Sequence, residues 1–394
     1  MKNSILIFSK YYEPGTKAGG QLKTVVNLVQ SMCGEYNFKI VTQDRDIGDK
    51  KSYPDVPIDS WVRRKNSDVY YLSLHNHYIQ RIMKILGKKN YSLIYLNSYF
   101  SPLFGFIPML LHKLLHDPRP VLVAPRGEFS PGALVQKILK KHIYRSIVSA
   151  LGLFDNVYWQ ASSSVEARQI VEFMKPTVKR IFIAMDFPDI TPINICRLES
   201  NSTSDDILNI IFISRICPIK NLEFVLQVLA SLKIDVVLEI YGPAEDPVYW
   251  QKCLRLISVM PDNVKVNYYG HLSPESVPKK MSESDLFFFP TKGENFGYVI
   301  WESLSAGTPV LLSDQTPWPK DEDFGSRAFP LSRPDLFAEY IEKYAALDAM
   351  GKSTARVAAK KIADSFVDHR EIKKATIAMI ETATARTSRQ PSRL

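Results

Sequence analysis

Short apolar segments alternate with amphipathic helical patterns along most of this chain, and they do so in two blocks. In the first block, apolar segments such as Ser4–Phe8, Leu93–Leu96 and Val121–Ala124 are separated by stretches whose apolar residues recur at helical spacing. Strands separated by helices are typical of βαβ units, in which the strands run parallel. The first block therefore predicts an α/β domain built on a parallel sheet.

A polar segment without periodicity, residues 190–206, ends the first block and has the composition of an interdomain linker. A second alternation follows, from a strand at Leu208–Ile213 to a strand at Val310–Leu312, and further helical patterns end it. Because 394 residues exceed what one hydrophobic core usually carries, two domains are expected. The predicted parts are domains at 1–189 and 207–367, the linker, a C-terminal helix at 368–385 that returns to the first domain, and a basic tail at 386–394.

The charge of the chain is unevenly distributed. The net charge is +9, and the first 190 residues hold 26 Lys and Arg against 15 Asp and Glu, whereas the rest hold 24 against 26. A basic first half indicates an anionic partner, such as acidic lipid headgroups, a diphosphate-linked acceptor or nucleic acid. A basic protein with a solvated face is the alternative.

No apolar stretch approaches the roughly 18 residues of a membrane span. The longest, Leu103–Leu111, contains Pro108 and predicts a buried helix, with a helix lying on a bilayer surface as the alternative. The N-terminal apolar residues are too few for a signal peptide and predict a strand. The four cysteines are scattered without a Cys-x-x-Cys pair, which favours reduced thiols and a cytoplasmic location.

The segment Thr291–Val310 carries the strongest functional signal. An apolar strand, Leu286–Pro290, leads into a loop with Glu294, then a helix with Glu302, and then a second apolar strand. Ligands of parallel sheets bind beyond the carboxyl ends of strands, and the N–H groups at a helix start favour an anion. The pattern predicts a site for a phosphate-bearing ligand. The alternative is that Glu294 caps the helix and Glu302 is a solvated surface residue.

Two cations and several glycines follow other predicted strands. Arg215 and Lys220 come after Leu208–Ile213, close to a helix start where cations are mildly unfavourable, so a bound diphosphate would account for them. The pair Gly19-Gly20 opens the first helix and would let the backbone approach a ligand. It is not a Gly-x-Gly-x-x-Gly fingerprint, so a nicotinamide cofactor is disfavoured. Nucleic-acid motifs are absent, and neither a metal nor nucleic acid is expected.

Taken together, these motifs resemble a known family. Glu294 and Glu302 are separated by seven residues, with Asn-Phe-Gly after the first and Ala-Gly-Thr-Pro after the second. This arrangement resembles the donor-site signature of retaining glycosyltransferase family 4. The segment Pro125-Arg126-Gly127 resembles a Pro-Arg-Gly branch of that family associated with bacterial surface polysaccharide synthesis. The resemblance implies the GT-B fold, in which two Rossmann-like domains face each other across a cleft.

The resemblance also implies roles for individual residues. It assigns catalysis to Glu294, Arg215 and Lys220, with the two cations on the donor phosphates. The donor-binding residues that it implies are Gly19, Gly20, Asn295, Phe296, Gly297, Tyr298, Glu302, Gly270 and Leu272. Arg126 stands where many relatives have a histidine and would hold the acceptor or a phosphate.

The function that follows is transfer of a hexose-type sugar from a nucleoside-diphosphate donor to a hydroxyl group, with retention at the anomeric carbon and without metal or cofactor. The expected acceptor is a lipid-linked saccharide, and the expected place is the cytoplasmic face of a membrane, with an anionic membrane surface as a candidate partner. A sugar-nucleotide epimerase of the same architecture is one alternative. A non-enzymatic basic scaffold that binds membrane or nucleic acid is the other.

Overall fold

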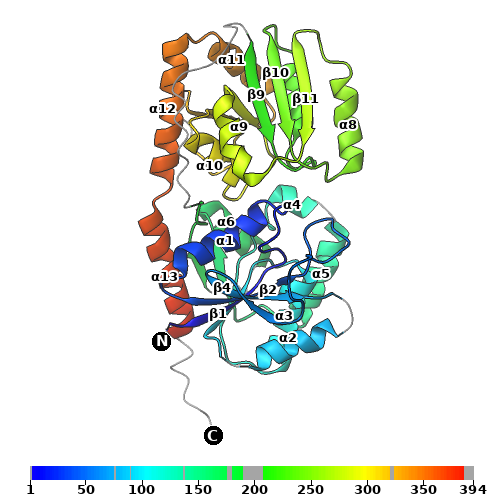
Figure 1. The fold of residues 1–394 in the computed structure, drawn as a ribbon, viewed down its shortest axis with the longest axis vertical. Helices are drawn as coiled ribbons and strands as arrows, with labels where there is room; N and C mark the ends of the chain where they lie inside the picture. The colour runs from blue at the N-terminus through cyan, green and yellow to red at the C-terminus, as the bar shows by residue number, and fades with distance from the viewer. Residues whose placement is uncertain are drawn as a thin grey trace. The chain divides into compact units, whose positions relative to one another are not determined.

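The computed structural model describes residues 2–74, 77–88, 90–135, 138–174, 180–189, 207–319 and 324–385. The chain forms two compact units, Met1–Ile190 with His369–Leu394, and Thr191–Asp368 (Figure 1). The predicted linker at 190–206, Cys196 within it and the tail at 386–394 lie outside the described residues. The other three cysteines, Cys33, Cys217 and Cys253, are free thiols, as predicted.

The N-terminal unit contains a sheet with the order β3-β4-β2-β1-β5-β6-β7-β8. Every neighbouring pair is parallel except β3 with β4. From β4 to β7 this is a doubly wound order, whose direction reverses between β1 and β5. The strands are β1 (Ser4–Phe8), β2 (Asn37–Gln43), β3 (Trp61–Arg63), β4 (Ser67–Leu72), β5 (Leu93–Leu96), β6 (Val121–Val123), β7 (Tyr158–Ala161) and β8 (Ile181–Ile183).

Helices flank this sheet, and the last helix of the chain packs in the same unit (Figure 1). The central strands are apolar throughout because both faces of the sheet are covered; Leu6, Ile7, Phe8 and Leu96 are 0% exposed. An ion pair of 2.8 Å joins Lys373 of the last helix to Glu35. The helices are α1 (Gly20–Met32), α2 (Tyr78–Gly87), the π-helical η1 (Pro102–Phe106), α3 (Ile107–Leu114), α4 (Pro131–Val135), α5 (Ile138–Ala150), α6 (Ser164–Met174) and α13 (His369–Ala385).

The C-terminal unit contains a second sheet, with the order β11-β10-β9-β12-β13-β14 and all neighbours parallel. In chain order this is 3-2-1-4-5-6, the doubly wound order of dinucleotide-binding domains. The direction reverses between β9 and β12, and ligands of such sheets bind beyond the carboxyl ends of the strands at this point. The strands are β9 (Leu208–Ile213), β10 (Val236–Tyr241), β11 (Val264–Gly270), β12 (Leu286–Phe289), β13 (Val310–Ser313) and β14 (Ser326–Phe329).

Local sequence accounts for several helix ends of this unit. Asp246 caps α8 by accepting a 3.0 Å hydrogen bond from the Tyr249 N–H, and Pro247 takes the first helical position. Asp348 caps α12 in the same way, at 2.7 Å from the Gly351 N–H. The helices are α7 (Leu222–Leu229), α8 (Pro247–Ile257), the 3₁₀ turn η2 (Pro274–Ser276), α9 (Val277–Glu283), α10 (Tyr298–Ser305), α11 (Pro334–Ala345) and α12 (Ala349–Phe366).

The predicted α/β class and the parallel sheets are confirmed, and nearly all predicted strands and helices are present. Two short edge strands, β3 and β14, were not predicted. Within residues 132–149 the described parts are helical, as α4 and α5, and residues 136–137 between them lie outside the described residues. The stretch 103–111 is helical and mostly buried, as predicted, with Phe104 at 1% and Met109 at 6% exposed.

Glycine is required where β10 ends. Gly242 has φ of 128°, and a Cβ built there would lie 1.8 Å from the Ser214 carbonyl oxygen. Its N–H donates to the Gly270 carbonyl oxygen at 2.6 Å, so the backbone cannot withdraw without losing this bond. The turns after β9, β10 and β11 are therefore packed closely by their backbones.

We expect Gly242→Ala to lower the free energy of unfolding by about 2 kcal/mol more than Gly270→Ala. Gly270 also has a positive φ, of 72°, but nothing lies within 4 Å of its built Cβ, so that variant isolates the backbone cost from the collision. Urea denaturation of both variants measures the difference. Equal stabilities would show that the Ser214 contact does not constrain this turn.

Candidate functional site

The candidate site lies where the C-terminal sheet reverses direction. Strand β9 leads into the loop with Arg215 and Lys220, and β12 leads into the loop with Glu294. The two strands are direct neighbours, with Ile210 beside Leu286 and Ile211 beside Phe287. Two motifs that are far apart in the sequence therefore begin at adjacent positions on one edge of the sheet.

Backbone hydrogen bonds hold these two loops together. The Ile219 carbonyl oxygen accepts from the Lys292 N–H at 2.8 Å and from the Thr291 hydroxyl at 3.1 Å. The Asn221 side-chain amide donates to the Pro290 carbonyl oxygen at 3.0 Å. Asn221 has a left-handed backbone, φ 64°, at the start of α7. The backbones flanking Lys220 and Glu294 are thus fixed relative to each other.

Lys220 and Glu294 form an ion pair. The Lys220 Nζ lies 2.5 Å from the Glu294 Oε2, and the side chains are only 14% and 17% exposed. The Lys220 ammonium also lies 5.3 Å from the centre of the Phe289 ring. Glu294 does not cap α10, because the N-cap residue is Gly297 and no side chain makes a capping bond there. The reading of Glu294 as a helix cap is therefore wrong.

Aromatic packing holds the segment between Glu294 and α10 in place. Phe296 contacts Tyr298 and Trp318 with ring centroids 4.8 and 5.7 Å apart, and the Trp318 indole N–H donates to the Phe296 carbonyl oxygen at 2.6 Å. Trp318 is 4% exposed and is a packing residue. Gly297 has φ of 79°, and a Cβ there would meet the Ile300 side chain at 2.8 Å. The chain thus enters α10 with its first N–H groups directed away from the helix.

Glu302 and Arg215 differ in exposure. Glu302 lies on α10 and is 8% exposed, so its reading as a solvated surface residue is wrong. Arg215 is about one-third exposed, and its Nη1 lies 2.5 Å from the Glu245 carboxylate. Sequence reasoning missed Glu245, which follows β10, the strand next to β9. Arg215 is therefore held by this carboxylate.

Gly270 and Leu272 lie at the carboxyl end of β11, and Leu272 directly follows His271 after the strand ends. The Tyr268 hydroxyl donates to the Gly242 carbonyl oxygen at 3.0 Å, which fixes this end of the strand to the end of β10. The rings of Tyr241 and Tyr269 stack with centroids 5.1 Å apart, and Tyr269 is 54% exposed. An aromatic surface therefore lies at the same edge of the sheet.

The predicted residues of the N-terminal unit lie at the corresponding edge of the other sheet. Gly20 is the first residue of α1, and Gly19 is its N-cap. The Asp46 carboxylate holds the preceding loop by accepting from the Thr16 N–H at 2.7 Å and the Lys17 N–H at 3.0 Å. Nothing lies within 4 Å of a Cβ built on Gly19, so the backbone there is open.

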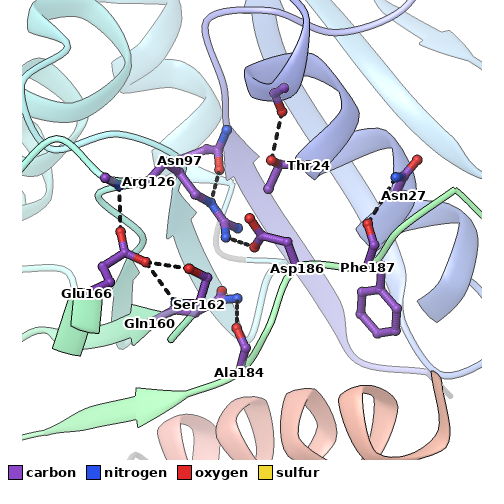
Figure 2. A network of polar contacts seen from close by, with 12 residues as sticks. Thr24, Asn27, Asn97, Arg126, Gln160, Ser162, Glu166, Ala184, Asp186 and Phe187 are labelled. Atoms are coloured by element: carbon purple, nitrogen blue, oxygen red, sulfur yellow. Dashed lines mark hydrogen bonds and ion pairs between the residues drawn. The ribbon is translucent and has the colours of Figure 1, made fainter. Parts of the chain in front are cut away.

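Arg126 is the centre of a buried polar network (Figure 2). Its Nε donates to the Asn97 side-chain oxygen at 2.9 Å, and its two terminal nitrogens contact the Asp186 carboxylate and the Tyr95 hydroxyl. The Arg126 side chain is 9% exposed and that of Asp186 is 3% exposed. The guanidinium thus makes internal contacts, and sequence reasoning missed its three partners.

The residues after Arg126 anchor neighbouring segments. The Gly127 N–H donates to Glu166 at 2.6 Å, and the Glu128 carboxylate accepts from the Ser98 hydroxyl at 2.6 Å and the Tyr99 N–H at 2.7 Å (Figure 2 shows the Glu166 contact). Burial raises the pKa of the Glu128 carboxyl above its ordinary value. The Pro-Arg-Gly segment therefore joins the carboxyl end of β6 to those of β5 and β7.

Asp186 titrates at an unusual pH. Burial raises the pKa of its carboxyl to about 6; the Arg126 guanidinium opposes this rise and the Glu166 carboxylate adds to it. A carboxyl whose pKa is raised binds its proton more tightly in the folded than in the unfolded state. Its contribution to stability is therefore largest at acidic pH and falls as the pH rises toward 6.

Across the described ranges, no three His, Cys, Asp or Glu side chains come together as metal ligands. None of the helices in those ranges has the length and hydropathy needed to cross a bilayer.

Two doubly wound sheets, parallel apart from β3, with a cation–carboxylate pair at one switch point, define an α/β protein of the doubly wound class. Residues 199–355 match the family model described as "Glycosyl transferases group 1". This stretch contains both members of the Lys220–Glu294 pair.

Solved structures resemble the chain over nearly its whole length. Sucrose-phosphate synthase from Thermosynechococcus elongatus has a TM-score of 0.74 at 14% identity, covering 98% of this chain and 100% of that chain. Anabaena HepE in complex with UDP and glucose has a TM-score of 0.69 at 16% identity, covering 96% and 100%. The fold is therefore that of GT-B glycosyltransferases.

One curated relative is similar in sequence over a shorter stretch. The O-antigen chain mannosyltransferase B of Escherichia coli is 28% identical over 116 residues, which is 28% of this chain and 29% of the relative. The matched stretch thus spans less than a third of the length of this curated relative.

Proposed function

We propose that the protein is a retaining glycosyltransferase that moves a hexose-type sugar from a nucleoside-diphosphate donor to a saccharide hydroxyl. The observation that carries this proposal is the contact between Lys220 and Glu294 at the switch point of the C-terminal sheet. The adjoining start of α10 offers N–H groups to an anion. A cation, a carboxylate and a helix start at one crevice suit a ligand that has both phosphate and sugar.

Lys220 and Arg215 would bind the donor diphosphate. An ammonium has three N–H donors, so Lys220 can keep its bond to Glu294 and also donate to a phosphate oxygen. Arg215 would exchange its exposed Glu245 partner for the phosphate, because a guanidinium donates to phosphate through two parallel bonds. Positive charge held where the leaving diphosphate develops its negative charge lowers the barrier.

The two carboxylates would have separate roles. Glu294, held by Lys220, would accept hydrogen bonds from sugar hydroxyls and stabilise positive charge near the anomeric carbon. Glu302, on the buried side of α10, would accept from the ribose hydroxyls. Retention would follow from attack on the face that the diphosphate leaves, with the departing phosphate taking the acceptor's proton. No step of this mechanism uses a metal or cofactor.

Residues of the N-terminal unit would serve the acceptor and the phosphates. Gly19 and Gly20 would let the backbone approach the diphosphate, since the space beside Gly19 is open. Arg126 donates internally and is 9% exposed, so we assign it to positioning Asn97 and Asp186 rather than to direct contact with the acceptor. The acceptor would be a lipid-linked saccharide of surface polysaccharide synthesis at the cytoplasmic face of a membrane. The E. coli O-antigen relative and the basic first half of the chain support this choice.

A thermal-shift screen of UDP, GDP, ADP and their sugars tests the proposal. One nucleoside diphosphate should raise Tm, because a ligand at about 100 times its Kd stabilises the folded state by about 2.7 kcal/mol. Glu302→Ala should reduce that shift through loss of the ribose contacts, whereas the exposed control Glu339→Ala should not. A wild-type protein stabilised by none of these nucleotides would overturn the proposed function.

Incubation with the donor alone separates the transferase from an epimerase. A transferase should leave the sugar configuration of the recovered donor unchanged, apart from slow hydrolysis. Accumulation of an epimeric sugar nucleotide would instead assign the site to epimerisation.

A further inference from the structure

Helix α5 exposes a row of large apolar side chains. Leu139, Ile143 and Ile147 are 70%, 52% and 46% exposed. They are spaced four residues apart, so they lie along one side of the helix. Val148, which is 3% exposed, lies on the opposite side and packs into the core. The helix therefore has apolar residues on both faces, and only one face is covered.

The row continues beyond the helix. Leu151 follows α5 and is 43% exposed, and Leu114 and Leu115 at the end of α3 are 63% and 42% exposed. The ends of the two helices lie together, because the Lys113 Nζ donates to the Leu151 carbonyl oxygen at 2.5 Å. We call this set the α5 surface; its apolar members are Leu114, Leu115, Leu139, Ile143, Ile147 and Leu151.

The charge around the α5 surface has one predominant sign. Helix α5 contains no acidic residue, and Lys140 and His142 beside the row are exposed, as is Lys113. Arg145 lies on the other side of the helix, with its guanidinium 5.0 Å from the centre of the Phe173 ring. The nearby Asp117 is buried in an ion pair with Arg119. The exposed acid Asp155 lies beside Gly152, close to the Leu151 end. Exposed apolar residues flanked by cations are typical of helices that lie in a membrane interface.

From this combination we propose that the α5 surface docks on an anionic lipid bilayer. The apolar side chains would enter the acyl boundary, while Lys140 and its neighbours would contact the headgroups. The centre of a protein–protein interface is depleted of charged residues, whereas the α5 surface has cations beside its apolar residues. Docking on a bilayer would bring the protein to the proposed lipid-linked acceptor, and this purpose rests on the proposed function. The proposed docking surface is therefore α5 and not residues 103–111, which are mostly buried.

Flotation with vesicles tests this proposal. The full chain should float with vesicles of phosphatidylglycerol and phosphatidylcholine at low salt, and much less with phosphatidylcholine alone. The triple variant Leu139→Ser, Ile143→Ser and Ile147→Ser should bind about 100-fold more weakly, because three apolar side chains no longer enter the bilayer. Lys140→Glu should weaken binding about tenfold.

A control variant removes three apolar side chains elsewhere that are more exposed than those of the α5 row. Val248, Val259 and Met350 are 82%, 74% and 75% exposed and lie in the C-terminal unit. Their triple serine variant should float like the wild type. If both triple variants bind equally well, or if the wild type binds neither vesicle, the proposal is overturned. The proposal would also be overturned if the wild type forms a dimer, the α5 triple variant is monomeric and neither binds vesicles. In that case the α5 surface would bind a second copy of the chain.

The outcome can be separated from that of the proposed function. Nucleotide stabilisation should be unchanged in the α5 variant, because its substitutions are in the other unit from Lys220 and Glu294. Vesicle binding without any nucleotide stabilisation would support membrane docking through the α5 surface and reject the proposed glycosyltransferase function. Nucleotide stabilisation without vesicle binding would reject only the docking of the α5 surface on a bilayer.

Discussion

Lys220→Met is expected to lower the turnover number for sugar transfer by about 100- to 1,000-fold. The substitution removes the ammonium that would stabilise the leaving diphosphate, and it releases Glu294 from a bond of 2.5 Å. Since the charge on the diphosphate develops mainly in the transition state, kcat should fall more than the affinity for the donor. Initial rates with the donor found by the nucleotide screen measure both quantities.

Two further variants separate charge from local structure. Lys220→Arg keeps the charge and should recover part of the rate, whereas Lys220→Met with Glu294→Gln should recover stability but not activity. Lys343→Met is the matched control, because Lys343 pairs with Glu339 at 2.7 Å but is 64% exposed, and such pairs contribute little. If Lys220→Met keeps the wild-type kcat, Lys220 has no role in catalysis.

Arg126→Met is expected to lower the free energy of unfolding at pH 8 by about 2–3 kcal/mol, because it leaves the Asp186 carboxylate buried without its cation, and protonation of that carboxyl limits the cost. Urea denaturation measures this loss. The control Arg63→Met removes an ion pair with Asp68 of 2.9 Å in which Arg63 is 74% exposed, and its cost should stay below about 1 kcal/mol.

The loss in Arg126→Met should depend on pH in a defined direction. Burial already raises the pKa of Asp186 to about 6 in the presence of Arg126, which opposes the rise. Removing Arg126 raises that pKa further, so Asp186 is protonated, and needs no cation, at acidic pH. The deficit relative to the wild type should be small at pH 5 and grow as the pH rises through and above 6. A deficit that is the same at pH 5 and pH 8 would contradict this account, and Asp186→Asn in the Arg126→Met background should remove its pH dependence.

Local patterns predicted the elements well because the central strands and most helices carry their own signal. Strand β12, Leu286–Phe289, is apolar at each position and is buried on both faces. The edge strands β3 and β14 lack such a signal. Ser326–Phe329 contains an arginine and is a strand because its backbone pairs with β13, a contact that no local pattern encodes.

The same distinction holds for the residues of the candidate site. The sequence marked Lys220 and Glu294 separately, but they are 74 residues apart, and only the adjacency of β9 and β12 brings them into contact. Asp186 lies 60 residues from Arg126, and Glu245 lies 30 residues from Arg215. These partners were missed because a single acidic residue after a strand has no distinguishing pattern.

By itself, the sequence determined the α/β class, the division into two blocks and the residue types that can bind a diphosphate and a sugar, since periodicity and motif spacing are local properties of the chain. The tertiary structure decided which charges pair, which of them are buried and which face of α5 remains uncovered. Those properties depend on the order of strands in each sheet and on the packing between distant segments. An apolar helix face looks the same in sequence whether it meets the core, as Val148 does, or solvent, as Leu139 does.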